Sequence, residues 1–118
     1  NILNWIFSID MKLNNELCAY AAKYGQLEVM QWIIANGGKF DSSASQMAVK
    51  CGYIDIVKWT RTNGCKWDTF ICLIAATDGH LEILQYLLAN GCPHDSVKHH
   101  AIQFNQTEIV TWLTENGY

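Results

Sequence analysis

Two short stretches of the chain carry side chains that often do chemistry. Residues 63–68 read NGCKWD and residues 90–95 read NGCPHD, so each combines a cysteine, a ring and an aspartate within a few positions. Thiolate and imidazole are preferred zinc ligands, and a thiol beside a base can act as a nucleophile. The spacing therefore raises the question of a metal or catalytic site that occurs twice.

The two stretches belong to a longer pattern, because the Asn-Gly pair recurs at nearly constant spacing. The pairs begin at Asn36, Asn63, Asn90 and Asn116, at intervals of 27, 27 and 26 residues. Self-similarity of this kind is typical of repeat proteins. We expect repeats over residues 14–40, 41–67, 68–94 and 95–118, preceded by a remnant of an earlier repeat over residues 1–13. Since the chain starts at Asn1 rather than Met, we expect it to be a piece of a longer array.

The repeat pattern argues against a metal site. Cys65 and Cys92 occupy equivalent positions of adjacent repeats, which would lie roughly 10 Å apart in a stack of helices. Zinc needs its ligand atoms about 2.0–2.3 Å from one ion, and no C-x-x-C or H-x₃-H spacing occurs. Cys18 and Cys72 also share an equivalent position, where small apolar residues pack. We therefore expect buried structural thiols and no metal.

A catalytic role is equally unsupported. His99 and His100 are adjacent, and adjacent helical side chains point about 100° apart, so that both rarely serve one site. The positions equivalent to His99 hold no histidine, and no nucleophile, base and orienting group come together in sequence. We expect no enzyme and no cofactor. An activity abolished by alanine at Cys65, Cys92 or His99 would contradict this.

Composition and charge exclude further classes. Eight Lys and Arg residues are scattered through a chain of net charge −3, whereas nucleic-acid-binding proteins usually show a clustered basic face. No run of 18 apolar residues suggests a membrane span. Five cysteines without disulfide-framework spacing favour thiols in a reducing compartment, so we expect a cytoplasmic protein.

Each repeat contains the signals of two helices. Asp41, Asp68 and Asp95 are placed as N-caps of a first helix with small residues at its centre. Glycine, or Asn105 in the last repeat, ends that helix in the left-handed conformation. Second helices are predicted to begin at Leu27, Ile54, Leu81 and Thr107. Their apolar positions follow an i, i+1, i+3, i+4 pattern, and the Asn-Gly pair closes them.

Two sets of rings recur in these repeats. The aromatic ladder at Trp5, Trp32, Trp59, Tyr86 and Trp112 is predicted to pack in the core rather than to form a recognition stripe. The rings at Phe40, Trp67 and His94 are predicted to cover the end of each helix pair. No stretch alternates with period two, so we predict an all-α solenoid of stacked helix-turn-helix repeats.

The stretch AATDGHLEILQYLLANG at residues 75–91, echoed by AAKYGQLEVMQWIIANG at residues 21–37, resembles the second half of an ankyrin repeat. Ankyrin repeats usually have 33 residues, whereas these have 27. The difference falls where ankyrin repeats carry a β-hairpin finger, which we expect to be shortened or absent. Short repeats joined by stretches such as NGCKWD and NGCPHD resemble the arrays of giant viruses, algae and oomycetes. A viral array would act in the host cytoplasm.

The resemblance implies a protein–protein interaction module, or scaffold, that binds its partner through the concave face of the first helices. The predicted partner-binding residues are Lys23, Tyr24, Lys50, Cys51, Phe70, Thr77, Asp78, His99, Gln103 and Phe104. Further early first-helix positions on this side are Glu16, Ser43 and Val97. The array could be the substrate-recognition arm of a larger adaptor, for example one with an upstream F-box. The alternative is an assembly protein that self-associates or lies in a virion, through contacts at residues 1–13 and at Trp112 and Leu113.

Overall fold

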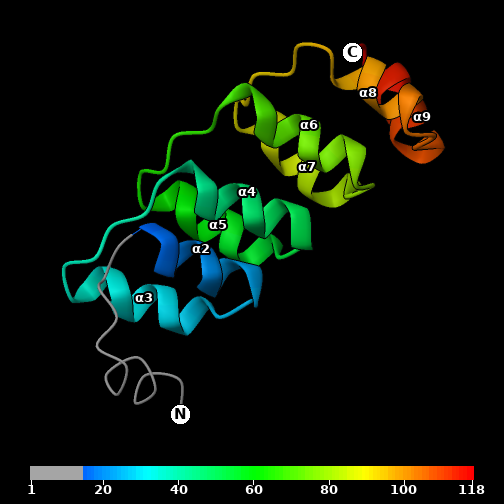
Figure 1. Ribbon diagram of the computed structural model, residues 1–118. Helices are drawn as coiled ribbons and strands as arrows, with labels where there is room; N and C mark the ends of the chain where they lie inside the picture. Colours follow the sequence, from blue (N-terminus) through cyan, green and yellow to red (C-terminus); the bar gives the residue numbers. More distant parts are fainter. Residues whose placement is uncertain (1–14) are drawn as a thin grey trace. The chain divides into compact units, whose positions relative to one another are not determined.

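The computed structural model describes residues 15–118, so the predicted remnant repeat at residues 1–13 lies outside the described residues. All regular structure in residues 15–118 is helical (Figure 1). The helices are α2 (Asn15–Lys23), α3 (Leu27–Ala35), α4 (Ser42–Cys51), α5 (Ile54–Thr62), α6 (Thr69–Thr77), α7 (Leu81–Ala89), α8 (Val97–Gln103) and α9 (Thr107–Glu115). The predicted all-α repeat fold without β-hairpin fingers is therefore confirmed for these residues.

The chain divides into two compact units, the first ending at Lys66 and the second formed by Trp67–Tyr118. The described residues of each unit form two helix hairpins, which Figure 1 shows as antiparallel pairs. In the first unit α2 packs on α3 and on α4, and α4 packs on α5. In the second unit α6 packs on α7 and on α8, and α8 packs on α9. Within each unit the first helices therefore lie side by side.

Two of the three predicted aspartate N-caps are confirmed. The side chain of Asp41 accepts a hydrogen bond from the Ser43 backbone N at 2.9 Å, and that of Asp68 accepts one from the Phe70 backbone N at 3.0 Å. The prediction for Asp95 is wrong, because α8 starts at Val97, one residue later than a cap at Asp95 requires, and Ser96 stands at its N-cap with φ 65° and no capping side-chain bond. The last repeat is one residue shorter than the others, and Asp95 lies in the turn that precedes α8.

The helix ends follow the predicted left-handed conformations. Gly25, Gly52 and Gly79 have φ values of 70°, 83° and 79°, and Asn105 takes their place with φ 59°. All four predicted starts of second helices, from Leu27 to Thr107, are confirmed to the residue. The prediction holds because caps and turns depend on local backbone chemistry.

Each unit has an apolar core between its helices. In the first unit the fully buried side chains include Cys18, Ala22, Met30, Ile33, Ala44, Ala48, Val49 and Val57. In the second unit they include Ile71, Cys72, Ala75, Ala76, Leu84, Leu87, Ala101 and Leu113. Alanine recurs where the first helices meet, since a small side chain lets two helix axes approach closely.

The aromatic ladder is only partly in the core, which corrects the prediction. Trp32, Trp59, Tyr86 and Trp112 are all half-buried. Phe40 lies against Trp59 with ring centroids 5.7 Å apart, and Trp67 lies edge-on to Tyr86 at 6.0 Å. Phe40 and Trp67 therefore each contact the ladder ring of the helix pair that follows them in the same unit, whereas His94 lies edge-on to Tyr118 at 5.0 Å.

Candidate functional site

Four of the five cysteines are buried. Cys65 and Cys92 are 6% and 2% exposed, Cys18 and Cys72 are fully buried, and Cys51 is exposed. None of these thiols forms a disulfide. Within residues 15–118 no three or more His, Cys, Asp or Glu side chains lie close enough together to hold a metal ion. The buried thiols therefore pack in the core, as predicted.

Cys65 and Cys92, which follow the Asn-Gly pairs, each have a partner on the first helix of their own repeat. In the first unit the Cys65 Sγ lies 3.1 Å from the Ser45 Oγ, which also donates to the Thr60 Oγ1 at 2.9 Å. In the second unit Cys92 is hydrogen bonded to Cys72, and this bond together with burial raises the pKa of the Cys72 thiol. Burial, with a smaller effect of Asp41, raises the pKa of Cys18 to about 11. The Cys18 and Cys72 thiols, whose pKa is raised, stay protonated near neutral pH, which makes these two poor nucleophiles.

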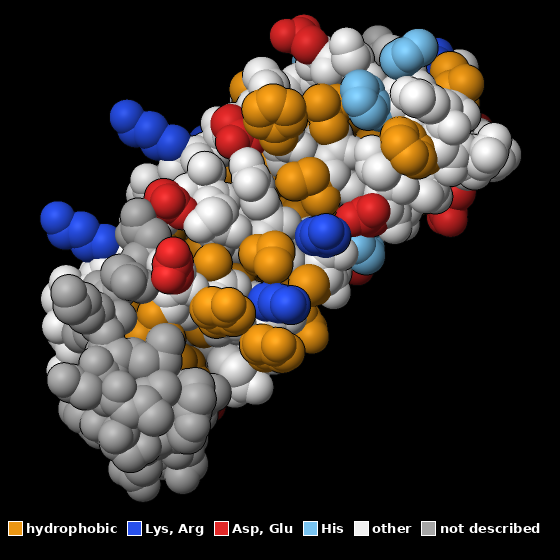
Figure 2. All heavy atoms as spheres, viewed as in Figure 1, with side chains coloured by type: hydrophobic (Ala, Val, Ile, Leu, Met, Phe, Trp, Pro, Cys, Tyr) orange, Lys and Arg blue, Asp and Glu red, His pale blue; other side chains and the backbone are white. Residues whose placement is uncertain are grey.

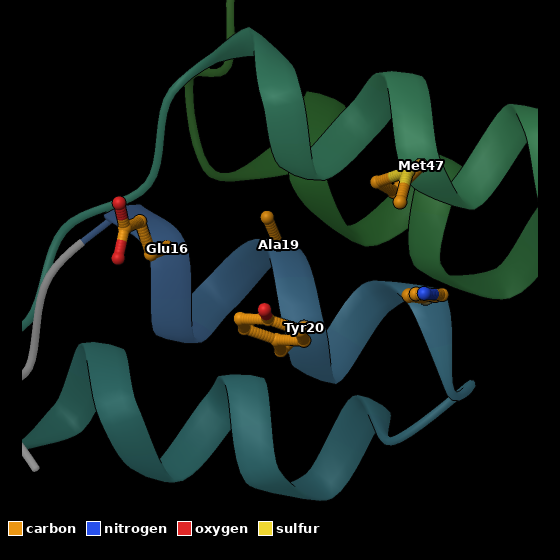
Figure 3. Close-up of a pocket in the computed structure, with 5 residues that line it drawn as sticks. Glu16, Ala19, Tyr20 and Met47 are labelled. Atoms are coloured by element: carbon orange, nitrogen blue, oxygen red, sulfur yellow. The ribbon is translucent and has the colours of Figure 1, made fainter.

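The clearest surface feature of the first unit is a hollow on α2 and α4. It has a volume of about 350 Å³ and is lined by Glu16, Ala19, Tyr20, Lys23 and Met47. Figure 3 shows Glu16, Ala19 and Tyr20 on α2, with Met47 projecting from α4 towards it. The hollow exists because α2 and α4 pack side by side with an alanine between the larger side chains.

The first unit exposes the residues predicted there for partner binding. Lys23, Tyr24, Lys50 and Cys51 are all exposed, and Tyr24 is 61% exposed. The Lys23 ammonium lies 5.5 Å from the centre of the Tyr24 ring, within the range of a cation–π interaction. Lys23 and Lys50 lie in the last turns of α2 and α4, where the helix dipole favours a cation. Their role in binding stays a prediction.

Hydrophobic and basic side chains share this surface. In Figure 2 they lie next to one another over the part of the molecule that Figure 1 shows as α2 and α4. Tyr20 is 57% exposed at the rim of the hollow. Glu16 lies in the first turn of α2, so the two ends of this helix carry opposite charges.

The second unit has its own exposed apolar side chains. Phe70 on α6 is 62% exposed, and Ile102 and Phe104 at the end of α8 are 56% and 48% exposed. Of the other residues predicted here, Asp78, His99 and Gln103 are exposed and Thr77 is half-buried. Val97 was expected on this side but is 2% exposed, because the missing residue of the last repeat shifts it to the core position of Ile71.

The sequence prediction missed three surface residues, Tyr20, Met47 and Ile102. A signal for Tyr20 was present, since it lies four residues after Glu16 and therefore on the same helix face. Met47 is the equivalent residue one repeat later. No comparable signal marks Ile102, because an isoleucine in a short helix is usually a core residue.

None of the helices in residues 15–118 has the length and hydropathy that crossing a membrane requires.

The comparison with curated proteins finds no match to this chain. The family model of ankyrin repeats (three copies) matches residues 18–96 and, in a second alignment, residues 45–118. Ankyrin repeats generally mediate protein–protein interactions and generally have no catalytic role. The two matches cover everything from residue 18 onward, and the chain therefore belongs to the ankyrin repeat family.

Proposed function

We propose that the first unit binds a partner protein through the exposed side of α2 and α4, which we call the first-helix face. The observation that carries this proposal is the hollow between Tyr20 and Met47, with Lys23 at its edge. The best-fitting partner segment places an apolar side chain in the hollow and an acidic side chain near the two lysines, Lys23 and Lys50.

The apolar part of the proposal rests on exposure. Tyr20 and Tyr24 are more than half exposed, although burial of an aromatic ring is favourable. Tyrosine is enriched among residues that dominate binding energy, because its rigid ring gives a large contact area at low entropic cost. A volume of about 350 Å³ accommodates one large side chain of a partner, and small-ligand pockets begin at a similar size.

The charged part of the proposal rests on the equivalent positions of Lys23 and Lys50 in two helices that pack together. Two ammonium groups on neighbouring helices attract an acidic side chain of a partner. Contacts of this type mainly raise the association rate and weaken with ionic strength. We therefore expect binding to the first-helix face to weaken as salt is added.

The second unit offers a separate contact through Phe70, Phe104 and Ile102, and Asp78 and His99 are exposed polar residues of the predicted set in this unit. A partner that engages both units gains affinity through linkage of two weak contacts. We infer that the partner is a protein in a reducing compartment such as the cytoplasm. The family resemblance also suggested a viral source and an adaptor with an F-box. We therefore propose, more specifically, that the array recruits the protein it binds as a substrate of such an adaptor.

Self-assembly is the second candidate function. Part of the surface expected to support it is covered in the structure: Leu113 is fully buried, and the Trp112 ring stacks on Tyr118 at 6.0 Å. The first-helix face, in contrast, is exposed. We therefore favour recognition of a different protein over self-association.

The proposal is tested by replacing Tyr20 with a photo-crosslinking phenylalanine derivative, crosslinking in host cytosol and sequencing the attached peptide. The captured partner is then purified and its affinity measured for the parent chain and for Lys23→Glu/Lys50→Glu. The charge-matched control is Lys58→Glu/Arg61→Glu on α5. We expect at least about a tenfold loss of affinity, equal to about 1.4 kcal/mol, in the first pair only. Equal losses in both pairs, or a crosslinked second copy of this chain, would overturn the proposal.

A further inference from the structure

The four Asn-Gly pairs hold a chemical property that partner binding does not use. Each pair stands at the end of a second helix with both residues exposed: Asn36-Gly37, Asn63-Gly64, Asn90-Gly91 and Asn116-Gly117. Asparagine followed by glycine is the dipeptide most prone to deamidation, because glycine has no side chain to hinder attack by its own backbone nitrogen. An unfolded chain of this sequence therefore contains four labile sites.

The fold engages both reacting groups of every pair. The side-chain Nδ2 of each asparagine donates to the backbone O of the ladder residue four positions earlier. The donor–acceptor distances are 2.8 Å for Asn36 to Trp32, 2.8 Å for Asn63 to Trp59, 2.9 Å for Asn90 to Tyr86 and 2.8 Å for Asn116 to Trp112. The backbone N–H of each following glycine donates to the carbonyl three residues earlier, at 3.1–3.3 Å.

Deamidation requires these bonds to break. The glycine nitrogen loses its proton and attacks the asparagine Cγ, a new N–Cγ bond forms, and the Cγ–Nδ2 bond breaks to release ammonia. Water then opens the five-membered imide to aspartate or isoaspartate, so that one water is consumed for each ammonia released. In the folded chain the asparagine ψ angles of 13–22° hold the peptide plane in its near-helical orientation, and the amide is held against the helix.

The product no longer fits the cap. An aspartate at this position has no N–H to donate and places a negative charge against a backbone carbonyl, at the helix end where the dipole is already negative. Isoaspartate adds a methylene to the backbone just before the left-handed glycine. That lengthening disturbs the following bond, for example from the Cys65 backbone N to the Thr60 O at 2.9 Å.

We propose that the four Asn-Gly helix caps are latent deamidation sites, protected by their own cap hydrogen bonds and exposed to reaction when the second helix of a repeat opens locally. Each conversion weakens the repeat that carries it and so promotes further opening. The number of deamidated Asn-Gly sites therefore increases with the time that the repeats spend open.

The test compares deamidation of the 118-residue chain in mildly alkaline buffer with and without denaturing urea. Samples in ¹⁸O-labelled water are digested and mapped by mass spectrometry, and Asn105, which is followed by Gln106, is the internal control. We expect all four Asn-Gly sites to convert in urea and Asn105 to lag. In the folded chain conversion is at least about tenfold slower, since even marginal local stability gives such a factor. Equal rates with and without urea, or no conversion in urea, would overturn the proposal.

A second measurement tests the consequence of deamidation. Asn63→Asp mimics the product at a cap with a side-chain bond, whereas Asn105→Asp makes the same charge change at a helix end that relies on a positive φ of 59°. We expect Asn63→Asp to lower Tm by about 4 °C more than Asn105→Asp does, because only the former loses a donor. An equal or smaller effect of Asn63→Asp would show that the cap bond contributes nothing.

Discussion

A buried pair of hydroxyl side chains in the first unit, Ser45 on α4 and Thr60 on α5, allows the stability contributed by a hydrogen bond between two helices to be measured. Ser45 and Thr60 are both fully buried, and the Ser45 hydroxyl donates to the Thr60 Oγ1 at 2.9 Å. The Thr60 hydroxyl in turn donates to the Val57 carbonyl at 2.8 Å, and the Cys65 Sγ lies 3.1 Å from the Ser45 Oγ. The position equivalent to Ser45 is a cysteine in two other repeats, and that equivalent to Thr60 is apolar in the other three.

Thr60→Val keeps the shape of the side chain and removes the acceptor of Ser45. We expect a loss of about 1–2 kcal/mol, because the buried serine keeps only the weaker sulfur contact. Ser45→Ala should cost about 0.5–1 kcal/mol, since Thr60 retains its bond to Val57. The double variant leaves neither hydroxyl buried, so we expect it to be about as stable as the parent, within about 1 kcal/mol.

The assay is urea unfolding followed by tryptophan fluorescence and by circular dichroism, which must give coincident transitions for a two-state treatment. The coupling energy of the double-mutant cycle should be about 2 kcal/mol in favour of the double variant. Thr62→Val is the control, because its hydroxyl is exposed and bonded to the Lys58 carbonyl at 3.0 Å. We expect that control to change stability by less than about 0.5 kcal/mol. Strictly additive single effects would refute the reasoning.

Three further predictions follow from helix ends and thiols. Asn105→Gly should stabilise the chain by up to about 1 kcal/mol, because the φ of 59° favours glycine; urea unfolding measures it, and a loss of stability would contradict it. Cys51 should be the first thiol labelled by an aromatic disulfide reagent in the folded chain, with the four buried thiols reacting only on opening; mass spectrometry of the labelled peptides shows the order, and early labelling of Cys72 would contradict it. Because the folded pKa of Cys18, about 11, lies above its ordinary value of 9.0, the stability that its neutral form contributes is complete below pH 9 and is lost as pH rises towards 11. Unfolding measured from pH 8 to 11 should therefore show a decline that is smaller by about 1–2 kcal/mol in Cys18→Ala than in the parent. Equal declines in the two would contradict this.

The sequence predicted those parts of the fold that depend on local chemistry. Glycine or asparagine at a left-handed position ends a helix wherever it occurs, so the ends at Gly52 and Asn105 were predictable without knowledge of the neighbours. The starts of the second helices and the absence of a hairpin finger in the described residues followed from the 27-residue period. The N-cap at Asp95 failed because one missing residue changes a turn in a way that residue type does not reveal.

The candidate site was predicted from the sequence only in part. Sequence spacing gave the exposed first-helix residues Lys23, Tyr24 and Lys50, because they follow the alanine pair at a fixed distance. It did not give the hollow between Tyr20 and Met47, which depends on how α2 and α4 pack. Sequence also placed the ladder rings in the core, whereas they are half-buried against the junction rings.

By itself, therefore, the sequence determined the left-handed ends of the helices and the starts of the second helices, since these depend on residues within one turn, and its recurring Asn-Gly pairs indicated a repeat protein. The tertiary structure alone decided which first-helix side chains enclose a hollow and that Cys65 meets Ser45. These features depend on the distance and rotation between packed helices, and the side chains of both helices together set those quantities. A single repeat unit does not carry that information.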